Sequence, residues 1–196
     1  MRKLIVLIAF SGLSLLATAQ TPAPQNAPAT TTQPQCASWL NQRLGKLHSD
    51  DILDLCALTA GKPVLLVNTA SYCGYTPQFK GLEALYQRYR KQGLTIIGFP
   101  SDDFFQESDD AATTATVCYV NYGVTFPMTA AIKVRGGDAH PIFKHLHQAG
   151  QPSWNFNKYL VGADGRVIAH FGSNTEPDDV ELTSAIEKEL LASKAK

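Results

Sequence analysis

The chain has 196 residues, of which 44% are hydrophobic and 17% are charged, and its 17 basic side chains balance its 17 acidic ones. This length suits a single domain with a sizeable core. Because the charge is balanced and no long basic run follows the N-terminus, nucleic acid and anionic membranes are not expected as partners.

Residues 1–19 have the features of a secretory signal peptide. Arg2 and Lys3 precede an apolar stretch that is too short to span a membrane, and Ala-Thr-Ala at 17–19 forms a cleavage site. Residues 20–35 contain mainly Pro, Thr, Ala and Gln, without charge or large apolar side chains, so they predict a flexible linker. We therefore expect an exported, periplasmic protein, not inserted in the membrane after cleavage, with one domain at 36–196.

The first half of this domain predicts a β-hairpin followed by a βαβ unit. Two short strand patterns, at 44–48 and 52–55, flank a polar turn. Residues 64–69 form an apolar run without alternation, as in a strand covered on both faces, and 94–99 form a second run. Apolar positions at helical spacing lie between these runs, so the two strands should be parallel.

The ends of this crossover helix are marked by particular residues. Pro77 suits the first helical position after a Thr76 cap, and Gly93 can end the helix. The next predicted elements are a marginal helix at 109–119 capped by Ser108, a strand at 126–134 and a helix at 139–148. A hairpin of strands at 158–161 and 166–171 follows. The final helix begins at about Pro177 and should bury Val180, Leu182, Ile186 and Leu190. This order predicts an α/β class, a thioredoxin-like α/β sandwich with a mixed central sheet and an N-terminal β-hairpin.

Cys73 lies between the first buried strand and the helix that follows it. Backbone N–H groups at a helix N-terminus favour the thiolate, which is the reactive form of cysteine. A dithiol of the C-x-x-C type would need a second cysteine at Thr76, so rapid disulfide exchange within one turn is excluded. A single thiolate with a distant partner cysteine is suited to peroxide reduction, because the sulfenic acid that forms must be resolved by another thiol.

Four cysteines in an exported chain allow three complete pairings, and two inert bridges are an alternative to any reactive pair. Cys36 and Cys56 bracket the predicted hairpin, which favours a structural bridge between them. Cys73 and Cys118 then remain as the second pair.

Several motifs in the chain resemble glutathione peroxidases, in the order and spacing of that family, over about residues 44–190. They are N-T-A-S-Y-C-G-Y-T-P-Q-F-K-G-L-E-A-L-Y (68–86), G-F-P (98–100), C-Y-V-N-Y-G-V-T-F-P (118–127) and W-N-F-N-K-Y-L-V (154–161). The resemblance implies a thioredoxin fold and a catalytic tetrad at Cys73, Gln106, Trp154 and Asn155. It also implies that Cys118 is the resolving cysteine of members recycled by thioredoxin.

The chain departs from the family pattern in the loop that follows the second buried strand. The family's F-P-C-N-Q-F-G-x-Q-E-P-G is replaced by F-P-S-D-D-F-F-Q-E-S-D, one residue shorter and without either glycine, so the loop before Gln106 must take a different path. Asp102 and Asp103 would oppose thiolate formation if they lay close to Cys73. The connection before Trp154 is short, which resembles the monomeric members with an open site.

The leading interpretation is a thiol peroxidase that reduces hydrogen peroxide and organic hydroperoxides. A thioredoxin-like protein or glutathione would reduce it, and no cofactor or metal is expected, since His145 and His147 point apart on a helix. The alternatives are an exported disulfide oxidoreductase or redox relay, and an inactive thioredoxin-fold binding module. We also expect the threonine-rich segment around Cys118 to unfold locally, so that Cys118 can reach oxidised Cys73.

Overall fold

A four-stranded mixed sheet forms the centre of the computed structural model, which describes residues 36–195; the signal-peptide and linker predictions lie outside this range. In spatial order its strands are β4 (Thr95–Pro100), β3 (Val64–Thr69), β5 (Lys158–Val161) and β6 (Val167–Phe171). β3 is parallel to β4 and antiparallel to β5, which is antiparallel to β6. The mixed sheet, the parallel βαβ unit and the C-terminal hairpin are therefore confirmed.

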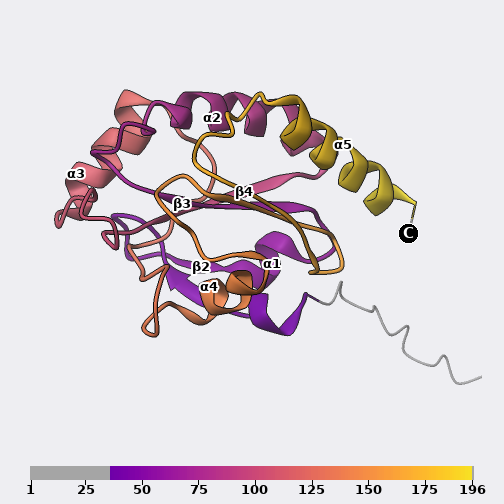
Figure 1. Cartoon of the computed structure of the whole chain (residues 1–196), viewed down its shortest axis with the longest axis horizontal. Helices are drawn as coiled ribbons and strands as arrows, with labels where there is room; N and C mark the ends of the chain where they lie inside the picture. Colours follow the sequence, from indigo (N-terminus) through magenta and orange to yellow (C-terminus); the bar gives the residue numbers. More distant parts are fainter. Residues whose placement is uncertain (1–35, 196) are drawn as a thin grey trace, which may run out of the picture. The chain divides into compact units, whose positions relative to one another are not determined.

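Helices cover both faces of this sheet (Figure 1). α2 (Gln78–Tyr89) and α5 (Val180–Lys194) share one hydrophobic cluster with Leu65 and Val67 of β3. α1 (Leu55–Thr59) and α4 (Pro141–Leu146) share a second cluster with Val64 and Leu66. Alternate residues of a strand point to opposite faces, so the uninterrupted apolar run of β3 reflects burial on both sides.

The predicted N-terminal hairpin is present as β1 (Arg43–Gly45) and β2 (Ile52–Asp54), which pair in antiparallel register. The predicted bridge is also present, with a Cα–Cα distance of 5.4 Å between Cys36 and Cys56. The second strand was predicted to reach Leu55, which instead begins α1. The Asp54 carboxylate accepts a hydrogen bond from the Ala57 N–H and so caps this short helix.

The predicted helix at 109–119 is wrong in its start, its cap and its geometry. α3 (Ala111–Ala115) is capped by Asp110, whose carboxylate accepts hydrogen bonds from the N–H groups of Ala112 and Thr113. The Ser108 hydroxyl instead accepts a bond from the Asp110 N–H. A π-helical segment, η3 (Thr116–Asn121), follows directly and carries Cys118. π-Helical turns are rare and often occur at functional sites.

The predicted strand at 126–134 is also wrong. Among the described residues this segment makes only isolated bridges, from Met128 to Gly98 and from Thr129 to Lys46. Pro127 has no N–H to donate, and the neighbouring groups bond alternately to β4 and to the region of β1. The segment therefore connects the sheet to the hairpin without joining either as a strand.

Two predicted helix starts are shifted as well. α2 begins at Gln78 rather than Pro77, and the Thr76 side chain does not cap it. α5 begins at Val180 with Asp179 as its cap, so Val180 is 78% exposed instead of buried. The helix predicted at 139–148 is shorter, because α4 ends at Leu146 and a 3-10 turn, η4 (His147–Ala149), follows it. Two more 3-10 turns are η1 (Ser38–Leu40) and η2 (Arg90–Gln92).

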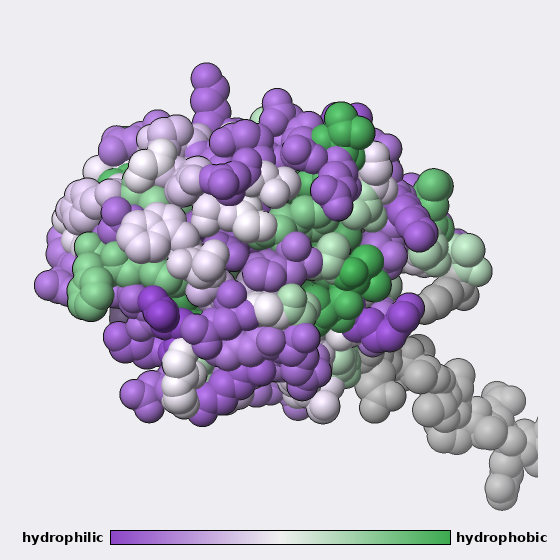
Figure 2. Space-filling model, viewed as in Figure 1, coloured by the Kyte–Doolittle hydropathy of each residue, from purple (hydrophilic) through white to green (hydrophobic). Residues whose placement is uncertain are grey.

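The surface seen in Figure 2 is mostly hydrophilic, with separate small hydrophobic areas. Within residues 36–195, no helix has the length and apolar character that crossing a membrane requires.

Candidate active site

The loops that follow β3 and β4 and the loop that precedes β5 meet at one edge of the sheet. Because β5 is antiparallel to β3, its N-terminal end lies beside the C-terminal end of β3. Cys73 follows β3, Gln106 follows β4, and Trp154 and Asn155 precede β5. Residues far apart in sequence are therefore brought to one place by the topology of the sheet.

Hydrogen bonds fix Gln106 in this site. Its side-chain oxygen Oε1 accepts a bond of 3.1 Å from Asn155 Nδ2. Its backbone carbonyl accepts a bond of 2.9 Å from the N–H of Tyr72, the residue before Cys73. The shortened loop thus still places Gln106 beside Asn155 and the Cys73 loop.

Cys73 lies in a tight turn and is only 5% exposed. Its sulfur is 3.4 Å from the backbone nitrogen of Tyr75, which donates to it. Thr76 stabilises the turn from inside, because its hydroxyl accepts a bond from the Cys73 N–H and donates one to the Ala70 carbonyl. Thr76 therefore has a structural role at the position where a C-x-x-C motif would carry its second thiol.

Asn68, at the end of β3, organises the loop that carries Trp154 and Asn155. Its Nδ2 donates to the Trp154 carbonyl, and its Oδ1 accepts from the Asn157 N–H. Its own carbonyl accepts from the Phe156 N–H at 2.6 Å. Asn68 is not among the residues predicted from sequence, although a polar side chain within a fully buried strand is a usable signal.

Lys158, the first residue of β5, is fully buried below the same loop. Its ammonium group donates to Gln78 Oε1 and to the carbonyls of Phe156 and Thr175, at 2.6 to 2.8 Å. Burial lowers the pKa of Lys158 to about 8. Three donated bonds require three hydrogens, so the amine is held in its protonated form at neutral pH.

The two remaining members of the predicted tetrad differ in exposure. Asn155 is fully buried, and its Oδ1 has no hydrogen-bond partner among the described residues. Trp154 is 39% exposed, and its ring lies 5.3 Å from that of Phe104. A buried amide oxygen without a partner at the site is suited to accept a bond from a small hydroxyl-bearing molecule.

The two aspartates of the shortened loop are occupied by other groups. The Asp103 carboxylate forms an ion pair of 3.0 Å with Lys133 and accepts the N–H groups of Val134 and Arg135. Burial alone would raise the pKa of Asp103. These bonds have the larger combined effect, so the pKa of Asp103 lies below its usual value. The Asp102 side chain accepts the N–H of Glu107. The carboxylate of Asp103 is therefore engaged with residues 133–135.

Cys118 is buried in the same hydrophobic cluster as Cys73, and both sulfurs are free thiols. Burial, together with the nearby charge of Glu107, raises the pKa of Cys118 to about 12. The thiol is therefore protonated at neutral pH. Glu107 is not among the residues predicted from sequence, and only its position directly after Gln106 could have indicated a role.

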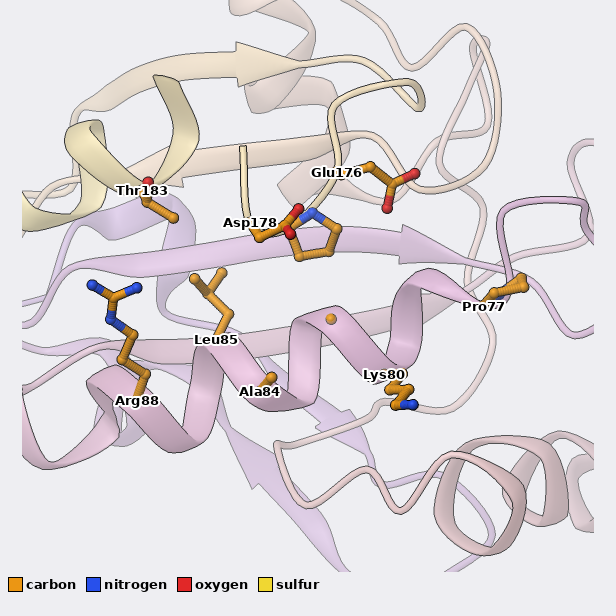
Figure 3. Close-up of a pocket in the computed structure, with 10 residues that line it drawn as sticks. Pro77, Lys80, Ala84, Leu85, Arg88, Glu176, Asp178 and Thr183 are labelled. Carbon is orange, nitrogen blue, oxygen red and sulfur yellow. The ribbon is translucent and has the colours of Figure 1, made fainter. Parts of the chain in front are cut away.

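Two hollows on the surface of residues 36–195 are candidate binding sites. A hollow of about 380 Å³ lies beside Trp154 and is lined by Tyr75, Trp154, Ser173 and three further residues. A larger groove, of about 430 Å³, lies between α2 and residues 176–183 (Figure 3), and none of the five candidate site residues lines it. The hollow beside Trp154 is therefore the better candidate for substrate approach.

The two histidines of the H-x-H pattern have separate partners. His145 stacks on Trp39, with ring centroids 4.3 Å apart, and His147 Nε2 lies 2.9 Å from the Val134 carbonyl oxygen. Across residues 36–195 no group of three or more His, Cys, Asp or Glu side chains is arranged to hold a metal ion.

Comparison with known proteins gives a consistent result. Residues 49–147 match the family model for glutathione peroxidase. The chain is 47% identical over 128 residues to a glutathione peroxidase of Lactococcus lactis, covering 62% of this chain and 82% of that protein. It is 42% identical over 143 residues to a hydroperoxy fatty acid reductase of Synechocystis, covering 66% of this chain and 83% of that protein.

A crystal structure of apo Trgpx superposes with a TM-score of 0.62 at 33% identity, covering 80% of this chain and 97% of that one. The chain belongs to the glutathione peroxidase family and is a thiol peroxidase of thioredoxin fold.

Proposed function

We propose that Cys73 is the peroxidatic cysteine of this thiol peroxidase, with Gln106, Trp154 and Asn155 as its catalytic partners. The observation that carries the proposal is the hydrogen bond from the Asn155 side chain to the Gln106 side chain. The Gln106 backbone carbonyl also accepts a bond from the N–H of Tyr72, the residue before Cys73. The side-chain bond joins the two amides next to the loop that carries Cys73, despite the shortened loop before Gln106. The sulfur also accepts a backbone N–H, which stabilises negative charge on it.

In the first step the Cys73 thiolate attacks one peroxide oxygen. An S–O bond forms and the O–O bond breaks, so that sulfur is oxidised to sulfenic acid and the peroxide is reduced to an alcohol or water once the leaving oxygen takes a proton. The amide of Asn155 and the indole N–H of Trp154 can donate hydrogen bonds to the oxygen on which charge develops. The electrons pass from sulfur to oxygen, so the step needs no cofactor.

In the second step the Cys118 thiol attacks the oxidised sulfur of Cys73. An S–S bond forms, the S–O bond breaks, and the hydroxyl group leaves as water with the proton of the Cys118 thiol. A dithiol protein of the thioredoxin type then reduces the Cys73–Cys118 disulfide. Glutathione is the alternative reductant.

The hollow beside Trp154 supports hydrogen peroxide and organic hydroperoxides as substrates. Two exposed aromatic side chains lie next to the candidate site residues: Tyr72, which precedes Cys73, is 62% exposed, and Phe105, which precedes Gln106, is 92% exposed. Their rings can contact an apolar substituent of the peroxide. The relative in Synechocystis is named for hydroperoxy fatty acids, which agrees with an apolar substrate.

We place the enzyme outside the cytoplasm, in the periplasm, as a monomer. The bridge between Cys36 and Cys56 supports export, because structural disulfides persist in oxidising compartments. The signal-peptide features of residues 1–19 point the same way. The short connection before Trp154 supports the monomer.

Rapid mixing of the reduced protein with peroxide, followed by acid quench and mass analysis, tests the proposal. We expect fast, stoichiometric oxidation of Cys73 and then a Cys73–Cys118 bridge. Oxidation no faster than that of a free thiol at the same pH would contradict the role of Cys73 and favour an inactive binding module. Rapid exchange of the bridge with client proteins, without fast peroxide reduction, would favour a redox relay.

A further inference from the structure

The Glu107 side chain joins the segments that carry the two cysteines. Its Oε1 accepts a hydrogen bond from the hydroxyl of Ser71, two residues before Cys73. The same oxygen accepts a bond of 3.0 Å from the hydroxyl of Thr114, on α3, and one of 2.8 Å from the Ser108 N–H. Three donors from three segments therefore converge on one carboxylate oxygen.

This group is buried and lies outside the proposed first step. Glu107 is 8% exposed, and both hydroxyl partners, Ser71 and Thr114, are buried as well. Burial raises the pKa of Glu107, while the bonds from Ser71, Ser108 and Thr114 oppose that rise. A buried carboxylate with this many donors is costly to separate from any one of them.

Thr114 is the threonine of this segment whose hydroxyl reaches the loop after β4. Thr113 bonds to its own cap, Asp110, and the Thr116 hydroxyl bonds to the Ala112 carbonyl within the helix. Thr114 precedes Cys118 by four residues and both side chains are buried, which places them on the inward side of the segment. The bond from Thr114 to Glu107 thus anchors the part of the segment from which Cys118 projects.

We propose that Glu107 is a positioning residue for the second step, which holds the Cys118 segment against the Cys73 loop and sets the rate of disulfide formation. This inference rests on the proposed roles of Cys73 and Cys118. For the S–S bond to form, Cys118 must leave its buried position and approach the oxidised sulfur. Breaking the bond between Thr114 and Glu107 is part of that movement, so the strength of this bond limits how often the segment opens.

Thr114→Val is the variant that tests the proposal, because it keeps the β-branched shape and removes only the donor. Thr116→Val is the matched control, since it makes the same change two residues away without touching Glu107. Both reduced proteins are mixed with hydrogen peroxide, and the loss of the Cys73 thiol and the appearance of the Cys73–Cys118 bridge are followed separately. We expect Thr114→Val to form the bridge about tenfold faster than the unmodified protein, with oxidation of Cys73 unchanged within about twofold.

Thr116→Val should leave both steps within about twofold of the unmodified protein. Equal acceleration in the two variants would overturn the proposal, because it would reflect helix propensity alone. Unchanged or slower bridge formation in Thr114→Val would overturn it as well.

Amide exchange of residues 111–121 in the reduced protein gives a readout that does not depend on peroxide. We expect about tenfold faster exchange in Thr114→Val and little change in Thr116→Val. If Cys73 does not react rapidly in any variant, the proposed function fails, whereas faster exchange still shows that Glu107 anchors the segment. Equal exchange in both variants would contradict the anchor itself.

Discussion

The loop that carries Trp154 and Asn155 and the segment that carries Cys118 contribute to the same hydrophobic cluster, but they are held by different means. The first is fixed by Asn68 and Lys158, fully buried side chains that together make five hydrogen bonds to it and to its surroundings. The second consists of a five-residue α-helix and a π-helical turn, joined to the loop after β4 through the hydroxyl of Thr114.

The two halves of the reaction make different demands on the protein. Stabilising charge at the peroxide oxygens needs donors that are already in position, and a dense buried network provides such rigidity. Resolution needs a thiol that moves, and segments with few anchoring contacts have low local stability. The contrast predicts that substitutions in the first region reduce stability and oxidation together, whereas those in the second change resolution alone.

The largest effects should come from the cysteines themselves. Cys73→Ser should remove peroxidase activity entirely, because the hydroxyl is not ionised at neutral pH and cannot replace the thiolate. Cys118→Ser should leave the first oxidation of Cys73 at its normal rate and abolish turnover with a dithiol protein. Rapid mixing with peroxide measures the first oxidation, and a coupled assay with a thioredoxin-type protein and its reductase measures turnover. Sustained turnover of Cys118→Ser would show that Cys118 is not the resolving residue.

The next largest effect should follow from Lys158→Met. Its loss leaves three buried or partly buried oxygen acceptors without their donor, at a cost of about 3 kcal/mol in the free energy of unfolding. Urea denaturation measures this cost, and the rate of Cys73 oxidation should fall because the Asn155 loop loses its support. Lys80→Met, at an exposed position of α2, is the control and should change stability by less than about 0.5 kcal/mol. A Lys158→Met protein as stable as this control would contradict the supporting role.

Much of this architecture could be predicted from sequence, for reasons visible in particular residues. The run at Val64–Thr69 predicted a central strand because burial on both faces removes the alternation of apolar and polar positions. Asp164 and Gly165 predicted the last hairpin, and Gly165 adopts a φ of 79°, which glycine tolerates without strain. These are local signals whose physical cause lies in the residues themselves.

The errors arose where distant contacts decide the structure. The segment around Met128 has strand-like composition, but its hydrogen bonds alternate between β4 and the hairpin region. The change from α- to π-geometry after Ala115 has no signal in the threonine-rich sequence. The roles of Asn68 and Glu107 depend on partners more than 30 residues away, which spacing in one chain does not indicate.

The pH dependence of resolution should sharpen the contrast between the two regions. Burial and Glu107 raise the pKa of Cys118 to about 12, so the thiol is protonated while the segment is closed, and it ionises more readily once the segment opens and the thiol reaches water. The rate of bridge formation from preformed sulfenic acid should therefore rise with pH between 7 and 9. Glu107→Gln keeps an acceptor oxygen and removes its negative charge, which should weaken the bond from Thr114 and increase the rate at each pH.

Rapid-quench measurements at several pH values test this dependence. Thr116→Val serves again as the variant expected to follow the unmodified curve. A rate of bridge formation that is constant from pH 7 to 9 would mean that ionisation of Cys118 does not control the step.

The smallest expected effect concerns Phe105, in the shortened loop before Gln106. Phe105 has a φ of 58° and is 92% exposed, so its backbone is strained and its ring contributes little burial. Phe105→Gly should relieve the strain of a left-handed residue, which is about 1 to 2 kcal/mol. Glycine has more conformational entropy in the unfolded chain, which offsets part of this, so the free energy of unfolding should rise by about 0.5 kcal/mol. His48→Gly, at an exposed turn with a φ of 48°, is the matched control for this backbone effect. If the Phe105 ring also contacts apolar substrates, only Phe105→Gly should raise KM for a bulky hydroperoxide, while both variants keep their rate with hydrogen peroxide. Equal KM values in the two variants would limit the role of Phe105 to the backbone.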